Sequence, residues 1–121
     1  MKQHDRKTQG VAGFMTEFGA LKGTPIGVES LNYLTDLADS KIQSWCYWQY
    51  KYNEDITTAS PDGAESFYVN GELDTNKVKA LSRTYAPIIA GTPSHHKFNP
   101  ATEEFDLRFD IPEVCSSSFV S

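Results

Sequence analysis

Two short apolar runs enclose a helical pattern in the first half of the sequence. Residues 11–16, VAGFMT, are apolar and bounded by glycine, which is typical of a strand that is buried on both faces. Residues 42–50, IQSWCYWQY, are rich in aromatic residues and predict a second buried strand. Between them, residues 28–40 carry apolar side chains three or four positions apart, which predicts an amphipathic helix. This order predicts a βαβ unit with a parallel pair of strands.

The second half of the sequence changes its period twice. Residues 51–73 show no sustained period, although Asn70-Gly71 predicts a tight turn. Residues 74–86 predict a helix with Asp74 or Thr75 as its N-cap. Residues 105–111 then alternate between apolar and charged side chains, and Asn99-Pro100 predicts a turn before them, so the tail predicts an antiparallel hairpin with one wet face. We expect the boundary between the two parts near residues 91–94.

Composition excludes several classes of protein. The chain has 121 residues and 39% hydrophobic residues, which fits one domain or a piece of a larger one. Its net charge of −5 comes with no basic stripe, so nucleic acid is not expected as a partner. No apolar stretch approaches the ~20 residues that span a bilayer, and the polar start lacks the apolar core of a signal peptide. Two cysteines, Cys46 and Cys115, leave the redox compartment open.

Glu17 is the first candidate for chemistry. It follows a predicted buried strand, and in parallel α/β sheets and barrels functional groups collect where strands end. A carboxylate there can act as nucleophile, base or ligand, and Gly19 would let the chain turn away. The alternative is a solvated acid at a strand terminus.

Trp48 is the second candidate. It lies one helix and one strand after Glu17, so both residues can reach the same edge of the sheet. An indole face stacks on the apolar face of a sugar, and a carboxylate beside it suits glycoside cleavage. The alternative for Trp48, and for its neighbours Trp45, Tyr47 and Tyr50, is packing in the core.

Other polar residues predict structural roles. His95 and His96 are adjacent, so on a strand they point to opposite faces and do not share a metal; a solvated or capping role is expected. Asp36 and Asp39 are expected on the solvent face of the helix, and Cys46 is expected to be a small buried hydrophobe. The acids of the last strand, Glu103, Glu104, Asp106 and Asp110, form its wet face, so no metal site is predicted and no cofactor is expected.

Five sequence blocks also carry a resemblance. They are FMTEFGA at 14–20, LTDLADSKIQSWCYWQYK at 34–51, TT at 57–58, ALSRTYAPIIAGTP at 80–93 and FNPATEEFDLRF at 98–109. In this order and spacing they resemble glycoside hydrolase family 5, and most closely its endoglycoceramidase branch. The resemblance implies an α/β fold, the C-terminal part of a (β/α)8 TIM barrel from strand seven to helix eight, followed by antiparallel β-sandwich strands. Residues 1–90 would then be barrel and residues 91–121 a partial β-sandwich domain.

The resemblance also implies roles for single residues. Glu17 matches the catalytic nucleophile of a retaining mechanism, and Trp48 matches the aromatic residue that lines the sugar subsite. Tyr50 and Lys51, just beyond Trp48, could contact a sugar hydroxyl. The substrate would be a glycosphingolipid or an oligosaccharide, with peripheral contact to lipid surfaces, and the branch cleaves the bond between glycan and ceramide.

One part of the family's machinery is not matched. The acid/base of the family sits in an Asn-Glu pair on an earlier barrel strand, upstream of Val11, whereas Asn53-Glu54 follows the predicted strand eight and is interpreted as a loop pair without a catalytic role. We therefore expect a C-terminal fragment that needs the missing N-terminal barrel half and is inactive alone. Two alternatives remain open: a non-catalytic carbohydrate- or lipid-binding remnant, and a family 5 enzyme that acts on a plain polysaccharide. The resemblance suggests a secreted or lysosome-type origin, although this sequence does not itself determine the compartment.

Overall fold

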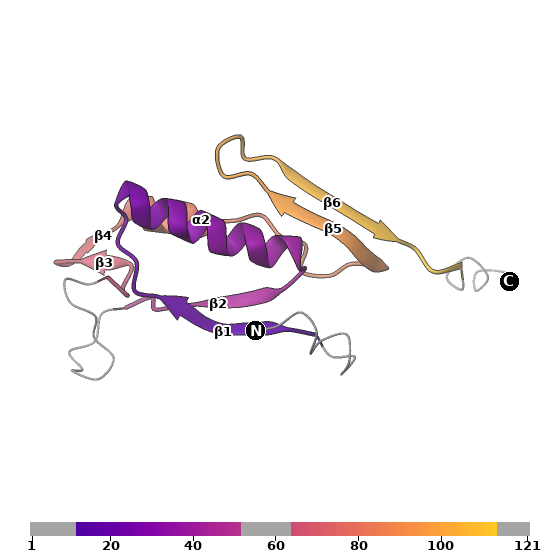
Figure 1. Cartoon of the computed structure of the whole chain (residues 1–121), viewed down its shortest axis with the longest axis horizontal. Coiled ribbons are helices and arrows are strands. Elements are labelled where there is room, and N and C mark those ends of the chain that lie inside the picture. The colour runs from indigo at the N-terminus through magenta and orange to yellow at the C-terminus, as the bar shows by residue number, and fades with distance from the viewer. Residues whose placement is uncertain (1–11, 52–63, 114–121) are drawn as a thin grey trace, which may run out of the picture.

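The computed structural model describes residues 12–51 and 64–113, which form a small α/β arrangement. In chain order the elements are β1 (Phe14–Gly19), α2 (Pro25–Ser40), β2 (Ser44–Trp48), β3 (Tyr68–Val69), β4 (Glu72–Leu73), α3 (Thr75–Leu81), β5 (Thr92–Phe98) and β6 (Phe105–Asp110). β1 and β2 form a parallel pair, and the other strands form two antiparallel hairpins, β3–β4 and β5–β6. Figure 1 shows α2 between the parallel pair and the β5–β6 hairpin.

The predicted βαβ unit is confirmed, although α2 begins three residues earlier than predicted. Thr24 is its N-cap, with its hydroxyl oxygen accepting a hydrogen bond from Gly27 N at 3.3 Å, and Pro25 occupies the first turn. Proline suits this position because its missing N–H has no helical partner there. The sequence LKGTPIG therefore contains the helix start as well as a loop.

The first strand differs more from its prediction. It begins at Phe14 and continues to Gly19, because Phe18 and Gly19 pair with Tyr47 and Trp48 of β2. Glu17 is therefore inside the strand and not at its end.

The segment between β2 and β5 contains a hairpin and a short helix. The predicted turn at Asn70-Gly71 is confirmed, since both residues have positive φ, 52° and 83°, between β3 and β4. Asp74 caps α3 as predicted, by accepting a hydrogen bond from Lys77 N at 3.1 Å. The helix ends at Leu81, several residues before the predicted end, and Ser82 is already extended.

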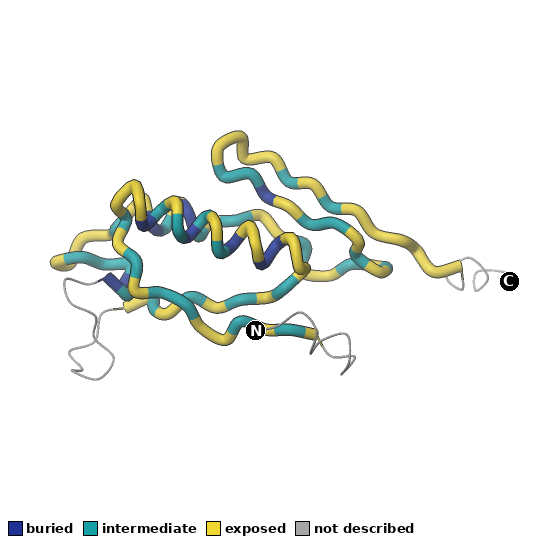
Figure 2. Tube along the Cα trace, viewed as in Figure 1, coloured by how far each residue is buried: buried dark blue, intermediate teal, exposed yellow. Residues whose placement is uncertain are grey.

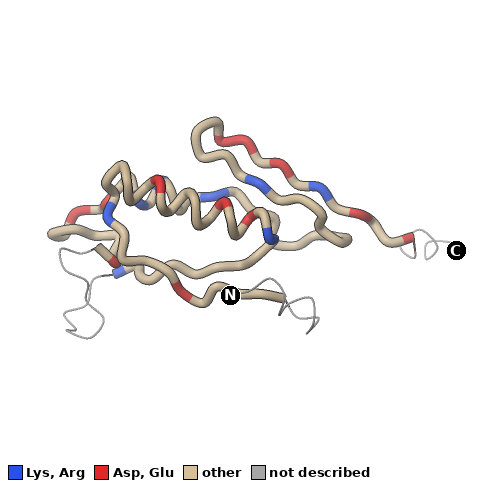
Figure 3. Tube along the Cα trace, viewed as in Figure 1, with Lys and Arg blue, Asp and Glu red and all other residues tan. Residues whose placement is uncertain are grey.

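The predicted antiparallel hairpin at the end of the chain is confirmed as β5–β6. Its turn spans Asn99 to Glu104, with Asn99 N donating to Glu104 O at 2.9 Å. The alternation is only partly expressed as burial: Phe105 and Leu107 are half-buried, while Phe109 is 40% and Ile111 is 66% exposed. Figure 3 shows charged residues spaced along β6, as the alternation predicts.

The core of the described residues is small. Its buried apolar members are Leu31, Ala38, Ala64, Ala80 and Phe98, and Figure 2 shows that buried positions recur along one side of α2. No helix in the described ranges is both long and apolar enough to cross a membrane. The predicted (β/α)8 barrel and β-sandwich extend beyond these elements and stay predictions; what is observed is the α/β arrangement itself.

Candidate active site

Glu17 lies in an irregular part of β1. Met15 pairs with Trp45 and Phe18 pairs with Tyr47, so Thr16 and Glu17 together oppose the single residue Cys46. This is a β-bulge, a device that changes the direction of a side chain and is frequent beside active sites. Glu17 is exposed. The cost of burying a charge is thereby avoided, because the Glu17 carboxylate remains in water.

The bulge places Glu17 and Trp48 on the same face of the parallel pair. The ring of Phe18 packs edge-on against Trp45 and Tyr47, at centroid distances of 5.4 and 5.5 Å, so these three share one face. Because side chains alternate along a strand, Glu17 and Trp48, next to Phe18 and Tyr47 respectively, point to the opposite face.

That opposite face is open in the described structure. Its members are exposed: Phe14, Thr16, Glu17, Ser44, Cys46 and Trp48. The prediction that Cys46 is buried is therefore wrong, since nothing described covers this side of β2. Trp48 is 42% exposed, so its indole is available to a ligand.

Gly19 brings the two strands together at their carboxyl ends. A Cβ on this residue would lie 1.8 Å from the backbone oxygen of Trp48, so only glycine fits. The residue with left-handed backbone is the next one, Ala20, with φ of 59°. The role of Gly19 is thus close approach of β1 to Trp48, and not the sharp turn that the sequence suggested. The peptide bond after Trp48 is cis.

Tyr50 lies beyond the end of β2 and is 63% exposed. Its hydroxyl lies 3.2 Å from that of Tyr68 in β3, and the two rings are perpendicular at 5.8 Å. Lys51, the other predicted contact, is also exposed and lies at the same end. Sequence reasoning missed Tyr68, which sits in a segment without a period; the only signal was its position next to the Asn70-Gly71 turn.

The side chains of Tyr47, Phe67 and Tyr50 form an aromatic cluster at the carboxyl end of β2. Tyr47 stacks on Phe67 at 5.2 Å, and Phe67 in turn packs edge-on against Tyr50 at 5.9 Å. Burial, followed by the negative charges of Asp74 and Glu65, raises the pKa of Tyr47 to about 12. Its hydroxyl has no hydrogen-bond partner among the described residues. Tyr47 therefore contributes to packing, which is the alternative predicted above for the aromatic residues of this strand.

Lys77 is a buried cation that the sequence did not single out. It is fully buried, and its Nζ donates to Ala64 O at 2.8 Å and to Ser66 O at 2.7 Å. Desolvation lowers its pKa, and Asp74 partly opposes that shift. Two charge-assisted bonds to backbone carbonyls fix the segment that precedes Tyr68.

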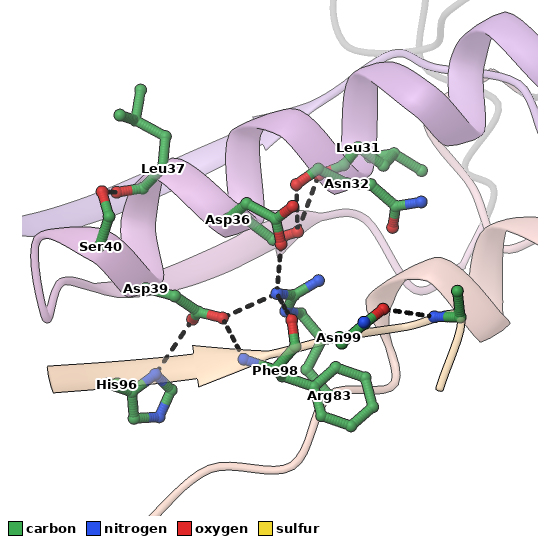
Figure 4. A network of polar contacts seen from close by, with 12 residues as sticks. Leu31, Asn32, Asp36, Leu37, Asp39, Ser40, Arg83, His96, Phe98 and Asn99 are labelled. Carbon is green, nitrogen blue, oxygen red and sulfur yellow. Dashed lines mark hydrogen bonds and ion pairs between the residues drawn. The ribbon is translucent and has the colours of Figure 1, made fainter. Parts of the chain in front are cut away.

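A second buried polar group joins α2 to the hairpin, as Figure 4 shows. Arg83 Nη2 donates to Asp39 Oδ2 at 2.7 Å, to Asp36 Oδ1 at 2.6 Å and to Phe98 O at 3.0 Å. The side chains of Arg83 and Asp39 are only 4% and 8% exposed. The prediction that Asp39 faces solvent is wrong, because Arg83 and β5 cover that side of the helix; Asp36 remains exposed as predicted.

The two histidines point to opposite faces of β5, as predicted. His95 Nε2 lies 3.3 Å from Asp106 Oδ2 on the outer face, and His96 Nδ1 lies 3.4 Å from Asp39 Oδ1 on the inner one. His96 is thus part of the buried group around Asp39 and not a solvated side chain. In the described ranges, no three His, Cys, Asp or Glu residues gather in an arrangement that could hold a metal ion. The pair Asn53-Glu54 lies outside the described residues.

Comparison with known proteins agrees with the resemblance. Residues 83–120 match the glycoside hydrolase family 5 C-terminal domain. The chain is similar to an endoglycoceramidase of Cyanea nozakii, with 26% identity over 122 residues that cover 98% of this chain and 24% of that protein. The chain therefore spans about a quarter of the length of this relative. No solved structure matches at a comparable level of significance. The two matches confirm the predicted resemblance to family 5 and its endoglycoceramidase branch.

Proposed function

We propose that this chain is the nucleophile-bearing part of a retaining glycoside hydrolase of the endoglycoceramidase type. The observation that carries the proposal is the β-bulge at Thr16 and Glu17, which exposes an acid on the same face as Trp48. The sequence resemblance, which implies that Glu17 is the nucleophile, is compatible with this arrangement.

In the proposed reaction, a Glu17 carboxylate oxygen attacks the anomeric carbon of the sugar. The bond from that carbon to the departing oxygen breaks, and a covalent glycosyl-enzyme forms. A second carboxyl protonates the departing oxygen and later takes a proton from the water that releases the sugar. The departing group would be ceramide, and the product an intact glycan.

The proposed substrate contacts come from residues at the carboxyl end of β2. Trp48 would stack on the sugar ring next to the bond that is cleaved, because its indole lies on the face of Glu17. Tyr50 and Lys51 would contact sugar hydroxyls at the strand end. The substrate is a glycosphingolipid or an oligosaccharide, and contact with a lipid surface follows from the ceramide group.

The proposal includes the larger fold. β1 and β2 would be strands seven and eight of a (β/α)8 barrel, residues 1–90 the barrel portion, and β5–β6 the first strands of a β-sandwich. The acid/base would come from the N-terminal barrel half, so the 121-residue chain alone is expected to hydrolyse nothing.

A chimera tests the role of Glu17. Residues 12–113 would replace the matching quarter of the Cyanea nozakii endoglycoceramidase, and turnover of a fluorescent glycosphingolipid would be measured. Glu17→Gln should lower turnover by at least about 1,000-fold, because the covalent step loses its nucleophile. Glu29→Gln, an exposed acid of α2, is the matched control and should leave turnover unchanged.

The outcomes separate the candidate functions. A mechanism-based fluoro-sugar should label Glu17 in the folded chimera. Turnover that survives Glu17→Gln, or a label on another residue, would refute the proposed nucleophile. A folded chimera that binds glycans but neither turns over nor is labelled would favour the carbohydrate- or lipid-binding remnant. Activity on a plain polysaccharide in place of the glycolipid would favour the other family 5 activity.

A further inference from the structure

Tyr50, which is exposed just beyond β2, and Tyr68, which is half-buried in β3, contact each other at the carboxyl end of the parallel pair. The hydroxyls of Tyr50 and Tyr68 lie 3.2 Å apart, and either can donate to the other. Tyr50 also contacts Phe67 at 78° and Tyr68 at 90°, so two neighbouring rings limit its orientation. Side chains that are held before a ligand arrives lose little entropy on binding.

A chain of hydrogen bonds connects Tyr68 to the interior. Lys77 Nζ donates to Ser66 O, and the hydroxyl of Ser66 accepts from Tyr68 N at 2.9 Å. Gln49 N donates to Glu65 O at 2.9 Å, and Phe67 N donates to Tyr50 O at 3.2 Å. The segment that carries Tyr68 is therefore fastened both to buried Lys77 and to the residues that directly follow Trp48.

The chemistry of the pair suits neutral, hydroxyl-rich ligands. When one tyrosine hydroxyl donates to the other, the pair still offers one free O–H donor and several acceptor lone pairs. The pKa of Tyr68 is raised, mainly by its hydrogen bond with Tyr50, so the Tyr68 hydroxyl keeps its proton near neutral pH. Neighbouring hydroxyls of a sugar ring present the same mixture of donors and acceptors.

The position of the pair relates it to the candidate active site. Gly19 and Trp48 pair where β1 and β2 end, and Figure 1 shows the β3–β4 hairpin next to that end of the two strands. A glycan held on Trp48 would extend past the strand ends, where Tyr50 and Tyr68 lie.

We propose that Tyr50 and Tyr68 act as one hydroxyl pair that binds ring hydroxyls of the glycan beside Trp48, with Lys77 as the positioning residue for Tyr68. This inference rests on the proposed function and adds to it a specificity-determining residue, Tyr68. The pair selects neutral hexoses with adjacent hydroxyls.

The test is a titration of the 121-residue chain with lactose, followed by the amide shifts in two-dimensional NMR spectra. Tyr68→Phe keeps the ring and removes the hydroxyl, and should raise Kd by about two- to tenfold, the usual effect of one lost hydrogen bond. Tyr33→Phe, a 67% exposed tyrosine on α2, is the matched control and should leave Kd unchanged. Both variants should give spectra that overlay the wild type away from the substitution.

A double variant tests whether the hydroxyls act together. Because the pair is one unit, Tyr50→Phe combined with Tyr68→Phe should cost less than the product of the two single effects. Independent, multiplicative effects would overturn the pair. A Tyr68→Phe Kd equal to that of Tyr33→Phe, or no lactose shift in the wild type, would overturn the site. If Trp48→Ala weakens lactose while Tyr68→Phe does not, this inference fails and the proposed function stands.

Discussion

Replacing Asp39 by asparagine is expected to loosen the attachment of the β5–β6 hairpin to α2. The substitution keeps the shape of the side chain and removes its charge. Asp39 accepts from Arg83 Nη2 at 2.7 Å and from Phe98 N at 3.4 Å, and lies 3.4 Å from His96 Nδ1. All three contacts cross from the helix to residues that follow Ser82.

The magnitude follows from burial. Breaking a buried ion pair costs about 3–5 kcal/mol, because the remaining charge stays out of water. Arg83 retains Asp36 and Phe98 O, which places the expected loss near the lower end, about 3 kcal/mol. Asp36 is 51% exposed, so Asp36→Asn should cost less than about 1 kcal/mol.

Amide hydrogen exchange of Phe98 measures this difference, since this amide is buried and bonded to Asp39. A loss of about 3 kcal/mol corresponds to exchange about 100-fold faster in Asp39→Asn. The Asp36→Asn control should change exchange by less than about fivefold. Equal effects of the two variants, or no acceleration of exchange in Asp39→Asn, would show that burial does not make the Asp39–Arg83 pair more stabilising than the Asp36–Arg83 pair.

Three further predictions concern other parts of the structure. Gly19→Ala should destabilise the pairing of β1 with β2 by at least about 2 kcal/mol, because the new Cβ would meet the backbone oxygen of Trp48. Gly71→Ala should cost only about 1 kcal/mol, because Gly71 has a positive φ but open space around it. Hydrogen exchange of the strand amides compares the two variants. Between pH 10 and about 12, an unfolded chain releases the Tyr47 proton that the folded chain keeps, so stability falls as pH rises; Tyr47→Phe should remove this fall in urea titrations, and an unchanged pH profile would contradict the assignment. The folded chain should bind the dye ANS, because large apolar side chains such as Trp48 and Ile88 are exposed; absence of dye binding would argue against this.

Much of the fold could be predicted from local patterns. The period of residues 28–40, the Asn70-Gly71 turn, the cap at Asp74 and the alternation of residues 105–111 each correspond to an observed element. These features depend on residues close in sequence, whose backbone preferences act without distant partners. The two candidate residues Glu17 and Trp48 were indicated by residue type and approximate position, and both are exposed in the structure.

Other properties depended on segments far apart in the chain. The pairing of β1 with β2 decided that Glu17 lies in a bulge inside the strand, because Phe18 packs on Trp45 and Tyr47 of a strand that follows only after residues 20–43. Helical periodicity could not reveal that Asp39 is buried, since Arg83 and His96 arrive from later elements. The contacts of Tyr68 and Lys77 could not be predicted either, because the segment before Tyr68 has no periodicity. Its conformation depends on the hydrogen bonds from Lys77 to its carbonyls and on the contact between Tyr50 and Tyr68. Sequence thus determined which elements form, and tertiary packing decided which polar side chains are buried, because burial depends on what distant segments cover.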